Sequence, residues 1–95
     1  MIEKKNYDKF IFKGSLALES YFDENNKDSK LFIDFNNKLT KYRSLQNKSI
    51  NDTETMVREL LSIINKIGKE NFIIYEDGDI EYIYENMKGD DSNVR

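Results

Sequence analysis

The sequence predicts an α+β domain in which about three helices are followed by a C-terminal antiparallel β-hairpin. Apolar residues recur at helical spacing along three successive segments between residues 6 and 67. Two short runs of β-branched and aromatic residues then flank Asp77-Gly78, which is the strongest short-range signal of a hairpin. The chain has 95 residues, of which 38% are apolar, so it can build one core. We expect residues 1–86 to form this single domain and residues 87–95 to be a polar, disordered tail.

The first segment predicts one helix over about residues 6–23. Its apolar and small residues share one helical face: Tyr7, Phe10, Ile11, Gly14, Ala17, Leu18, Tyr21 and Phe22. Gly14 would then lie at a close helix contact, where glycine costs about 1 kcal/mol relative to Ala. The alternative is a short strand at residues 9–12, followed by a helix that starts at Ser15. That strand would add a third member to the hairpin sheet, and we favour the single helix.

The second segment predicts an amphipathic helix. Its apolar stripe consists of Leu31, Phe32, Phe35, Leu39, Tyr42 and Leu45. Asp28 or Ser29 is the expected N-cap. Asp34 and Lys38 are four residues apart in the favourable order, so they are expected to pair on the exposed side. The polar residues 46–50 are expected to form a loop.

The third segment carries the clearest start and stop signals. Asn51 with Glu54 three residues later resembles a capping box, and Gly68 stands where a glycine commonly ends a helix. The apolar residues between them are Met56, Val57, Leu60, Leu61, Ile63, Ile64 and Ile67. Because this face is too wide for one partner, we expect the third helix to lie at the centre of the core.

The register of the hairpin depends on the length of its turn. A two-residue turn would place Glu76 opposite Asp79, and such a like-charge pair is destabilising. A three-residue loop with a left-handed Gly78 would instead align Phe72 and Ile74 with the second strand, and we prefer this register. The side chains of that strand alternate, with Ile80, Tyr82 and Tyr84 on one face and Asp79, Glu81, Ile83 and Glu85 on the other.

Several kinds of chemistry are excluded by composition. The chain has no Cys, His, Trp or Pro, so it has no disulfide, zinc thiolate site, catalytic Cys or His-based triad. The segment from Asp77 only superficially resembles a calcium loop, because Tyr82 replaces the required glycine and Lys88 the final Glu. We therefore expect no enzyme activity, no cofactor and no metal. No apolar run is long enough for a signal peptide or a membrane span, so we expect a cytoplasmic protein without membrane contact.

Charge is distributed unevenly along the chain, whose formal net charge is −3. Residues 1–48 carry ten Lys and Arg against seven Asp and Glu, whereas residues 70–95 carry eight acids against two basic residues. The acidic end is either a solvated surface or a surface that binds something basic. Tyrosines near these acids favour an interface. The candidate partner-binding residues are Tyr75, Glu76, Asp77, Asp79, Glu81, Tyr84 and Glu85.

These features favour a small, acidic, non-catalytic binding protein that inhibits or sequesters a macromolecule. The abundance of Lys, Asn and Ile is typical of low-GC bacteria and their mobile elements. The most concrete version is a phage-type inhibitor of a nucleic-acid-binding host protein, or an immunity protein for a toxin. Its acidic hairpin would enter a basic groove of the partner protein, so direct binding of nucleic acid is not expected.

Two other functions compete with this interpretation. Three helices followed by a hairpin also fit a winged-helix-like DNA-binding regulator, in which the hairpin is the wing. The residues available for phosphate contacts would be Lys38, Lys41, Arg43 and Lys48. The other alternative is a homo-oligomer, in which the positive first half of one copy meets the acidic hairpin of the next.

Overall fold

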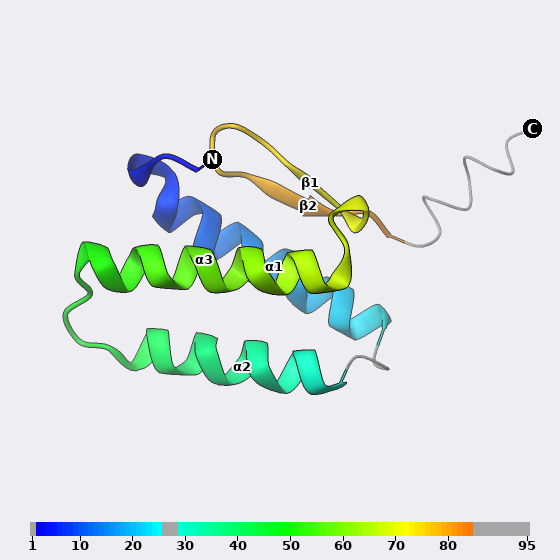
Figure 1. The fold of residues 1–95 in the computed structure, drawn as a ribbon, viewed down its shortest axis with the longest axis horizontal. Coiled ribbons are helices and arrows are strands. Elements are labelled where there is room, and N and C mark those ends of the chain that lie inside the picture. The colour runs from blue at the N-terminus through cyan, green and yellow to red at the C-terminus, as the bar shows by residue number, and fades with distance from the viewer. Residues whose placement is uncertain (1, 26–28, 85–95) are drawn as a thin grey trace, which may run out of the picture.

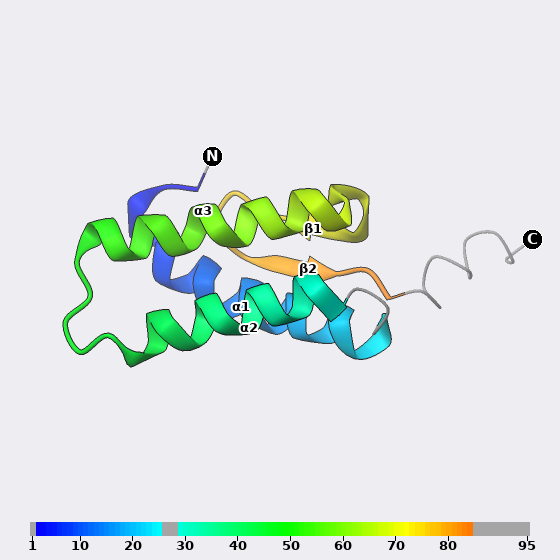
Figure 2. The ribbon, with the colours of Figure 1, turned by 60° about the horizontal axis from the view of Figure 1, so that its bottom comes forward.

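The computed structural model describes residues 2–25 and 29–84. The elements in chain order are the 3₁₀ turn η1 (Lys4–Asn6), helices α1 (Tyr7–Glu24), α2 (Ser29–Ser44) and α3 (Ile50–Ile67), the 3₁₀ turn η2 (Lys69–Asn71), and strands β1 (Phe72–Ile74) and β2 (Ile80–Tyr82). Helices α2 and α3 lie side by side as an antiparallel pair, and α1 crosses them (Figures 1 and 2). The hairpin packs on α1 mainly through β2. This arrangement confirms the predicted α+β class.

A single helix spans the first segment, and the alternative strand at residues 9–12 is wrong. Phe10, Ile11, Gly14 and Leu18 are all buried, and only helical spacing places these four positions on one face. Ser15 is also buried, and its hydroxyl donates a hydrogen bond to the carbonyl of Ile11 at 2.6 Å. The polar atom on this face is therefore satisfied within the helix.

Gly14 does lie at a close contact, as predicted. A Cβ atom at this position would lie 3.4 Å from Leu60 Cδ1 on α3 and 3.9 Å from Ile80 Cγ2 on β2. A helix and a strand thus pack on α1 at the same point, at distances that leave room for a methyl group. We expected α3 to lie at the centre of the core, but α1 is the helix that packs against α3, α2 and β2. Both helices contribute fully buried side chains, with Phe10 and Leu18 on α1 and Leu60, Ile63 and Ile64 on α3.

The ion pair predicted on α2 forms, but not on an exposed side. Lys38 Nζ lies 3.1 Å from Asp34 Oδ2 and also 3.1 Å from Glu59 Oε2 on α3. The pair therefore lies along the seam between α2 and α3, where Lys38 links the two helices. Helix α2 begins at Ser29, and the other proposed cap, Asp28, lies outside the described residues.

The predicted start of α3 is wrong by two residues. Ser49 is the N-cap, and its hydroxyl accepts a hydrogen bond from the Asp52 N–H at 3.1 Å. The Asp52 carboxylate accepts the Ser49 N–H at 3.0 Å, which completes a capping box. Asn51 and Ile50, which were expected to be cap and loop, are inside the helix. At the other end, Gly68 follows the last helical residue as predicted, and its N–H bonds to the Ile64 carbonyl.

The hairpin has the preferred register. Phe72 pairs with Tyr82 and Ile74 pairs with Ile80. The Tyr75 N–H donates to the Asp79 carbonyl at 2.9 Å, which leaves a three-residue loop at 76–78. Gly78 adopts a left-handed φ of 93°, so the like-charge pair of the shorter turn is avoided.

The capping box yields a first prediction. Ser49→Ala removes the side chain that satisfies the Asp52 N–H, so it should lower the free energy of unfolding by about 1 kcal/mol. Asn51→Ala is the control, because this exposed residue lies inside the helix and should change stability by less than about 0.5 kcal/mol. Urea denaturation of both variants measures the difference. A larger loss in Asn51→Ala would contradict the observed helix start.

The two buried glycines yield a second prediction with opposite signs. Ala at Gly14 meets only ordinary contacts and gains helix propensity, so Gly14→Ala should stabilise the protein by up to about 1 kcal/mol. Ala at Gly78 would need the left-handed conformation and would lie 2.9 Å from the Asn6 carbonyl oxygen. Gly78→Ala should therefore cost about 1–3 kcal/mol. Thermal unfolding followed by circular dichroism tests whether the two melting temperatures move apart.

Candidate partner-binding surface

The two faces of the hairpin differ in what they contact. Phe72, Ile80 and Tyr82 are buried. The opposite surface, which we call the outer face, carries Ile73, Tyr75, Glu81 and Ile83. Ile73 is 43% exposed and Tyr75 is 41% exposed. The outer face thus presents large apolar side chains next to a carboxylate.

One hydrogen bond organises the outer face. The Tyr75 hydroxyl donates to Glu81 Oε1 at 3.1 Å across the two strands. Because the neutral phenol donates this bond to a carboxylate, the pKa of Tyr75 is raised above its ordinary value. The phenol therefore stays neutral at physiological pH and holds the Glu81 carboxylate beside its ring.

Two of the predicted acids are already paired within the molecule. Asp77 Oδ2 lies 2.8 Å from Lys9 Nζ, and Asp79 Oδ1 lies 3.7 Å from Lys13 Nζ, so both bind lysines of α1. Both carboxylates also accept backbone N–H groups of the turn and the following strand. The hydrogen bond from Lys9 lowers the pKa of Asp77. The positive first half of the chain and the acidic hairpin therefore meet inside one molecule.

The other predicted partner-binding residues lie in different parts of the structure. Glu76 is exposed at the turn and makes no ion pair with any residue of the described ranges. Tyr84 points to the α1 side, where its hydroxyl lies 3.4 Å from Ser20 Oγ and its ring centre lies 5.0 Å from that of Tyr82. Glu85 lies outside the described residues, as does the predicted tail at 87–95. Of the seven predicted residues, the structure brings Tyr75, Glu76 and Glu81 together on the accessible side of the hairpin.

Sequence reasoning missed the apolar part of this surface. Ile73 and Ile83 lie on the outer face with Tyr75 and Glu81, and neither was counted as a binding residue. The alternation already placed Ile83 beside Glu81 in the second strand. The signal that could have placed Ile73 and Ile83 on this surface is an apolar side chain at a strand position that faces away from the core; in the structure Ile73 is exposed and Ile83 is half-buried.

Two of the four basic residues considered for DNA binding already interact with other residues of the chain. Lys38 binds Asp34 and Glu59. Lys48 donates to the Leu45 carbonyl at 3.1 Å and lies 5.1 Å from the centre of the Tyr42 ring. Lys41 and Arg43 are exposed, and neither forms an ion pair with another residue of the described part of the chain.

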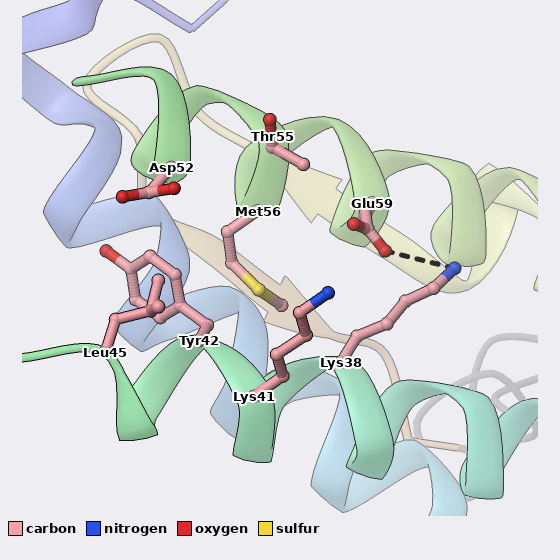
Figure 3. A pocket seen from close by; sticks show the side chains of 8 residues that line it. All are labelled: Lys38, Lys41, Tyr42, Leu45, Asp52, Thr55, Met56 and Glu59. Carbon is pink, nitrogen blue, oxygen red and sulfur yellow. Dashed lines mark ion pairs between the residues drawn. The ribbon is translucent and has the colours of Figure 1, made fainter. Parts of the chain in front are cut away.

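Lys41 lines a pocket of about 310 Å³ between α2 and α3, beside Met56 and the Lys38–Glu59 pair (Figure 3). Its two basic side chains, Lys38 and Lys41, lie on α2 and its two acidic side chains, Asp52 and Glu59, lie on α3, so it is not a uniformly positive surface for phosphate. The side-by-side arrangement of α2 and α3 also differs from a helix-turn-helix, whose two helices cross at about 90–120°.

Comparisons with known proteins identify no relative. The chain matches no protein-family model, and neither a curated protein nor a solved structure is significantly similar to it. Within residues 2–25 and 29–84, no cluster of three or more acidic side chains could hold a metal ion. No helix of this described part has the length and apolar character needed to cross a membrane.

The Lys9–Asp77 pair yields a third prediction. Lys9→Met removes the cation, so the pKa of Asp77 should rise towards its ordinary value. Because the pKa of Asp77 is depressed in the folded protein, the pair stabilises the fold above the unfolded-state pKa and loses this effect as pH falls through the folded pKa. The stability difference between the native protein and Lys9→Met should therefore shrink in acid.

Carboxyl carbon shifts measured by NMR across the acid range report the Asp77 titration, and urea denaturation at the same pH values reports stability. Lys66→Met is the control, since Lys66 is an exposed residue near the end of α3. An Asp77 titration that is identical in all three proteins would contradict the role of Lys9.

Proposed function

We propose that this chain is a small, non-catalytic binding protein that acts by occupying a basic surface of a macromolecular partner. The observation that carries the proposal is the outer face of the hairpin, where exposed Ile73 and Tyr75 lie beside Glu81 and close to Glu76. The most concrete version is an inhibitor, encoded by a phage or another mobile element, of a nucleic-acid-binding host protein. An immunity protein for a toxin is the other version of the same class.

The apolar side chains support an interface over a merely solvated surface. The hairpin buries one face on α1, and its outer face lies towards solvent. Polar residues are usual on the solvent-facing side of an antiparallel sheet. It carries Ile73, Tyr75 and Ile83 instead. A contiguous group of exposed apolar and tyrosine side chains with a polar rim is typical of binding surfaces.

The charges support a basic partner and narrow the set of contact residues. Asp77 and Asp79 are neutralised by α1 and needed for the turn, so they contribute little free charge to a partner. Glu76 and Glu81 carry no basic counter-ion from the described residues. Uncompensated carboxylates beside an apolar centre favour a partner with Lys or Arg around an apolar contact, and they speed association at low salt.

The remaining features agree with a binding role. The chain lacks His and Cys, which removes the usual activated nucleophiles and bases. Nothing in the placement of α2 and α3 favours the winged-helix alternative. The homo-oligomer alternative needs the acidic hairpin to meet basic residues of another copy, yet Lys9 and Lys13 pair with Asp77 and Asp79 of the same copy.

A fourth prediction tests this proposal by charge reversal. Glu76→Lys combined with Glu81→Lys should reduce capture of the protein partner from a low-GC bacterial lysate by at least about tenfold, because it reverses both free carboxylates of the surface. The readouts are mass spectrometry of the captured protein and the ratio of absorbance at 260 and 280 nm. Circular dichroism checks that the variant is folded.

The matched control is Glu19→Lys combined with Asp23→Lys, which changes the net charge equally on α1. If both double variants lose the partner equally, charge alone explains the binding and the surface is wrong. Equal capture by the hairpin variant and the native protein would also contradict the proposal. Captured nucleic acid without protein would favour the DNA-binding alternative.

A further inference from the structure

Strand β1 has a free edge. In the hairpin the Tyr75 N–H bonds to the Asp79 carbonyl, and the Ile83 N–H bonds to the Asn71 carbonyl. Hydrogen-bonded and non-hydrogen-bonded pairs alternate along an antiparallel ladder, so Ile74 opposite Ile80 is a non-hydrogen-bonded pair. The N–H and C=O of Ile74 therefore point away from β2. Neither group has a hydrogen bond with any other described residue.

Phe72, two residues earlier, is the other position of β1 whose backbone groups point outward. Its N–H is taken by the Lys69 carbonyl, whereas its C=O remains on the open edge. The edge thus offers one donor and two acceptors over three residues, which is the start of a ladder for another strand.

A groove runs beside this edge. It has a volume of about 530 Å³ and lies between the N-terminal segment, α3 and β1. Ile2, Leu61 and Ile74 provide its apolar lining, and Glu3 and Glu76 are the acidic residues on its rim. Figures 1 and 2 both show the N-terminal segment beside the turn of the hairpin. An extended chain placed here would meet the outward N–H and C=O groups of β1 along one side, and it would lie over the apolar side chains that line the groove.

We propose that the edge of β1 receives an extended segment of a protein partner, which adds to the hairpin as a third strand. This inference rests on the proposed function and specifies how the partner is held. The segment donates to the Ile74 carbonyl and accepts from the Ile74 N–H, as in other cases of strand addition. Its side chains alternate, so that an apolar residue enters the groove over Leu61 while its neighbours face solvent.

The charge on the rim of the groove indicates which side chains flank the apolar residue of the incoming segment. Glu3 is paired with Lys5, whose Nζ lies 3.7 Å from Glu3 Oε1, whereas Glu76 forms no ion pair with a described residue. The unpaired carboxylate of Glu76 at the edge favours Lys or Arg on the incoming segment. The partner is therefore a protein with an exposed, basic and apolar extended segment, which suits a nucleic-acid-binding protein.

A second copy of the chain fits the edge less well. One antiparallel register that uses both outward residues pairs Phe72 of each copy with Ile74 of the other. This register brings Glu70 of each copy towards Glu76 of the other, and like charges across a ladder are destabilising. The like charges disfavour this register of self-pairing, and the hydrogen-exchange measurement below tests the register that pairs Ile74 with Ile74 of the other copy.

The experiment uses the full chain labelled with ¹⁵N and a synthetic hexapeptide of alternating Lys and Val with blocked ends. We expect the peptide to bind, to shift the amide signal of Ile74 and to slow its hydrogen exchange. Methylation of the backbone nitrogens of the peptide keeps its charge but removes its donors. This change should weaken binding by at least about tenfold, because the ladder bonds are lost.

Two matched comparisons separate strand addition from attraction of a cation to an acidic protein. A peptide with three Lys followed by three Val has the same charge and composition, and it should bind at least about tenfold more weakly because its apolar and basic side chains no longer alternate. Ile74→Pro removes the outward N–H without touching a bond of the existing ladder, and it should lose the alternating peptide. If this variant does not fold, the comparison with the methylated peptide still tests whether binding needs backbone hydrogen bonds.

Three results would overturn the inference. These are no binding of the alternating peptide at millimolar concentration, equal binding of the methylated peptide, and slow exchange of Ile74 that depends on protein concentration without peptide. The last result would assign the edge to a second copy. None of them affects the capture experiment with Glu76→Lys and Glu81→Lys, so failure of strand addition is distinguishable from failure of the proposed function.

Discussion

The close approach of α3 and β2 to α1 at Gly14 is the contact on which the rest of the structure depends. Leu60 and Ile80 come from elements that are distant in sequence, and both reach the space left by the absent side chain. A side chain larger than that of Ala here would push either the helix or the strand outward. Because interiors are close-packed, such a shift would propagate through the buried side chains of both layers. This position therefore needs a small residue, and a methyl group is the largest side chain that meets only ordinary contacts there.

An aromatic cluster continues the same contact towards the other end of α1. Tyr21 packs edge-on against Phe22 and Tyr82, with ring centres 5.2 Å and 5.6 Å apart. Tyr82 also contacts the ring of Phe72 on the neighbouring strand. Its hydroxyl donates to Glu24 and accepts a hydrogen bond from Asn25, so the phenol is satisfied at the end of α1. The hairpin is thus anchored along its inner face, which leaves the outer face available to a partner.

The same docking decides which charges remain free. Once β2 lies on α1, the turn reaches Lys9 and Lys13, and Asp77 and Asp79 become part of the fold. Glu76 and Glu81 lie outside the reach of these lysines. The proposed binding surface is consequently smaller than the run of acids in the sequence, and it includes the exposed Ile73 and the half-buried Ile83. Exposed ion pairs contribute little stability, so the main effect of these pairs is on the electrostatic potential at the surface of the hairpin.

Local patterns were sufficient for most of the fold. The apolar periodicity predicted three helices because each must bury one face, and Asp77-Gly78 predicted the loop because few residues other than Gly adopt a left-handed φ readily. The start of α3 was missed because two overlapping segments satisfy the capping pattern. Ser49 with Asp52 and Asn51 with Glu54 both place an acid three residues after a capping residue. Local chemistry alone does not choose between them.

By itself, the sequence determined the fold class, the hairpin register and the absence of His- and Cys-based chemistry, since these follow from composition and from contacts between near neighbours. Only the tertiary structure decided which hairpin acids are free, which edge of the sheet is open and which helix contacts every layer. Lys9 and Asp77 are separated by 68 positions along the chain. Contacts of this kind depend on how the whole core packs, and no local pattern of residues carries that information.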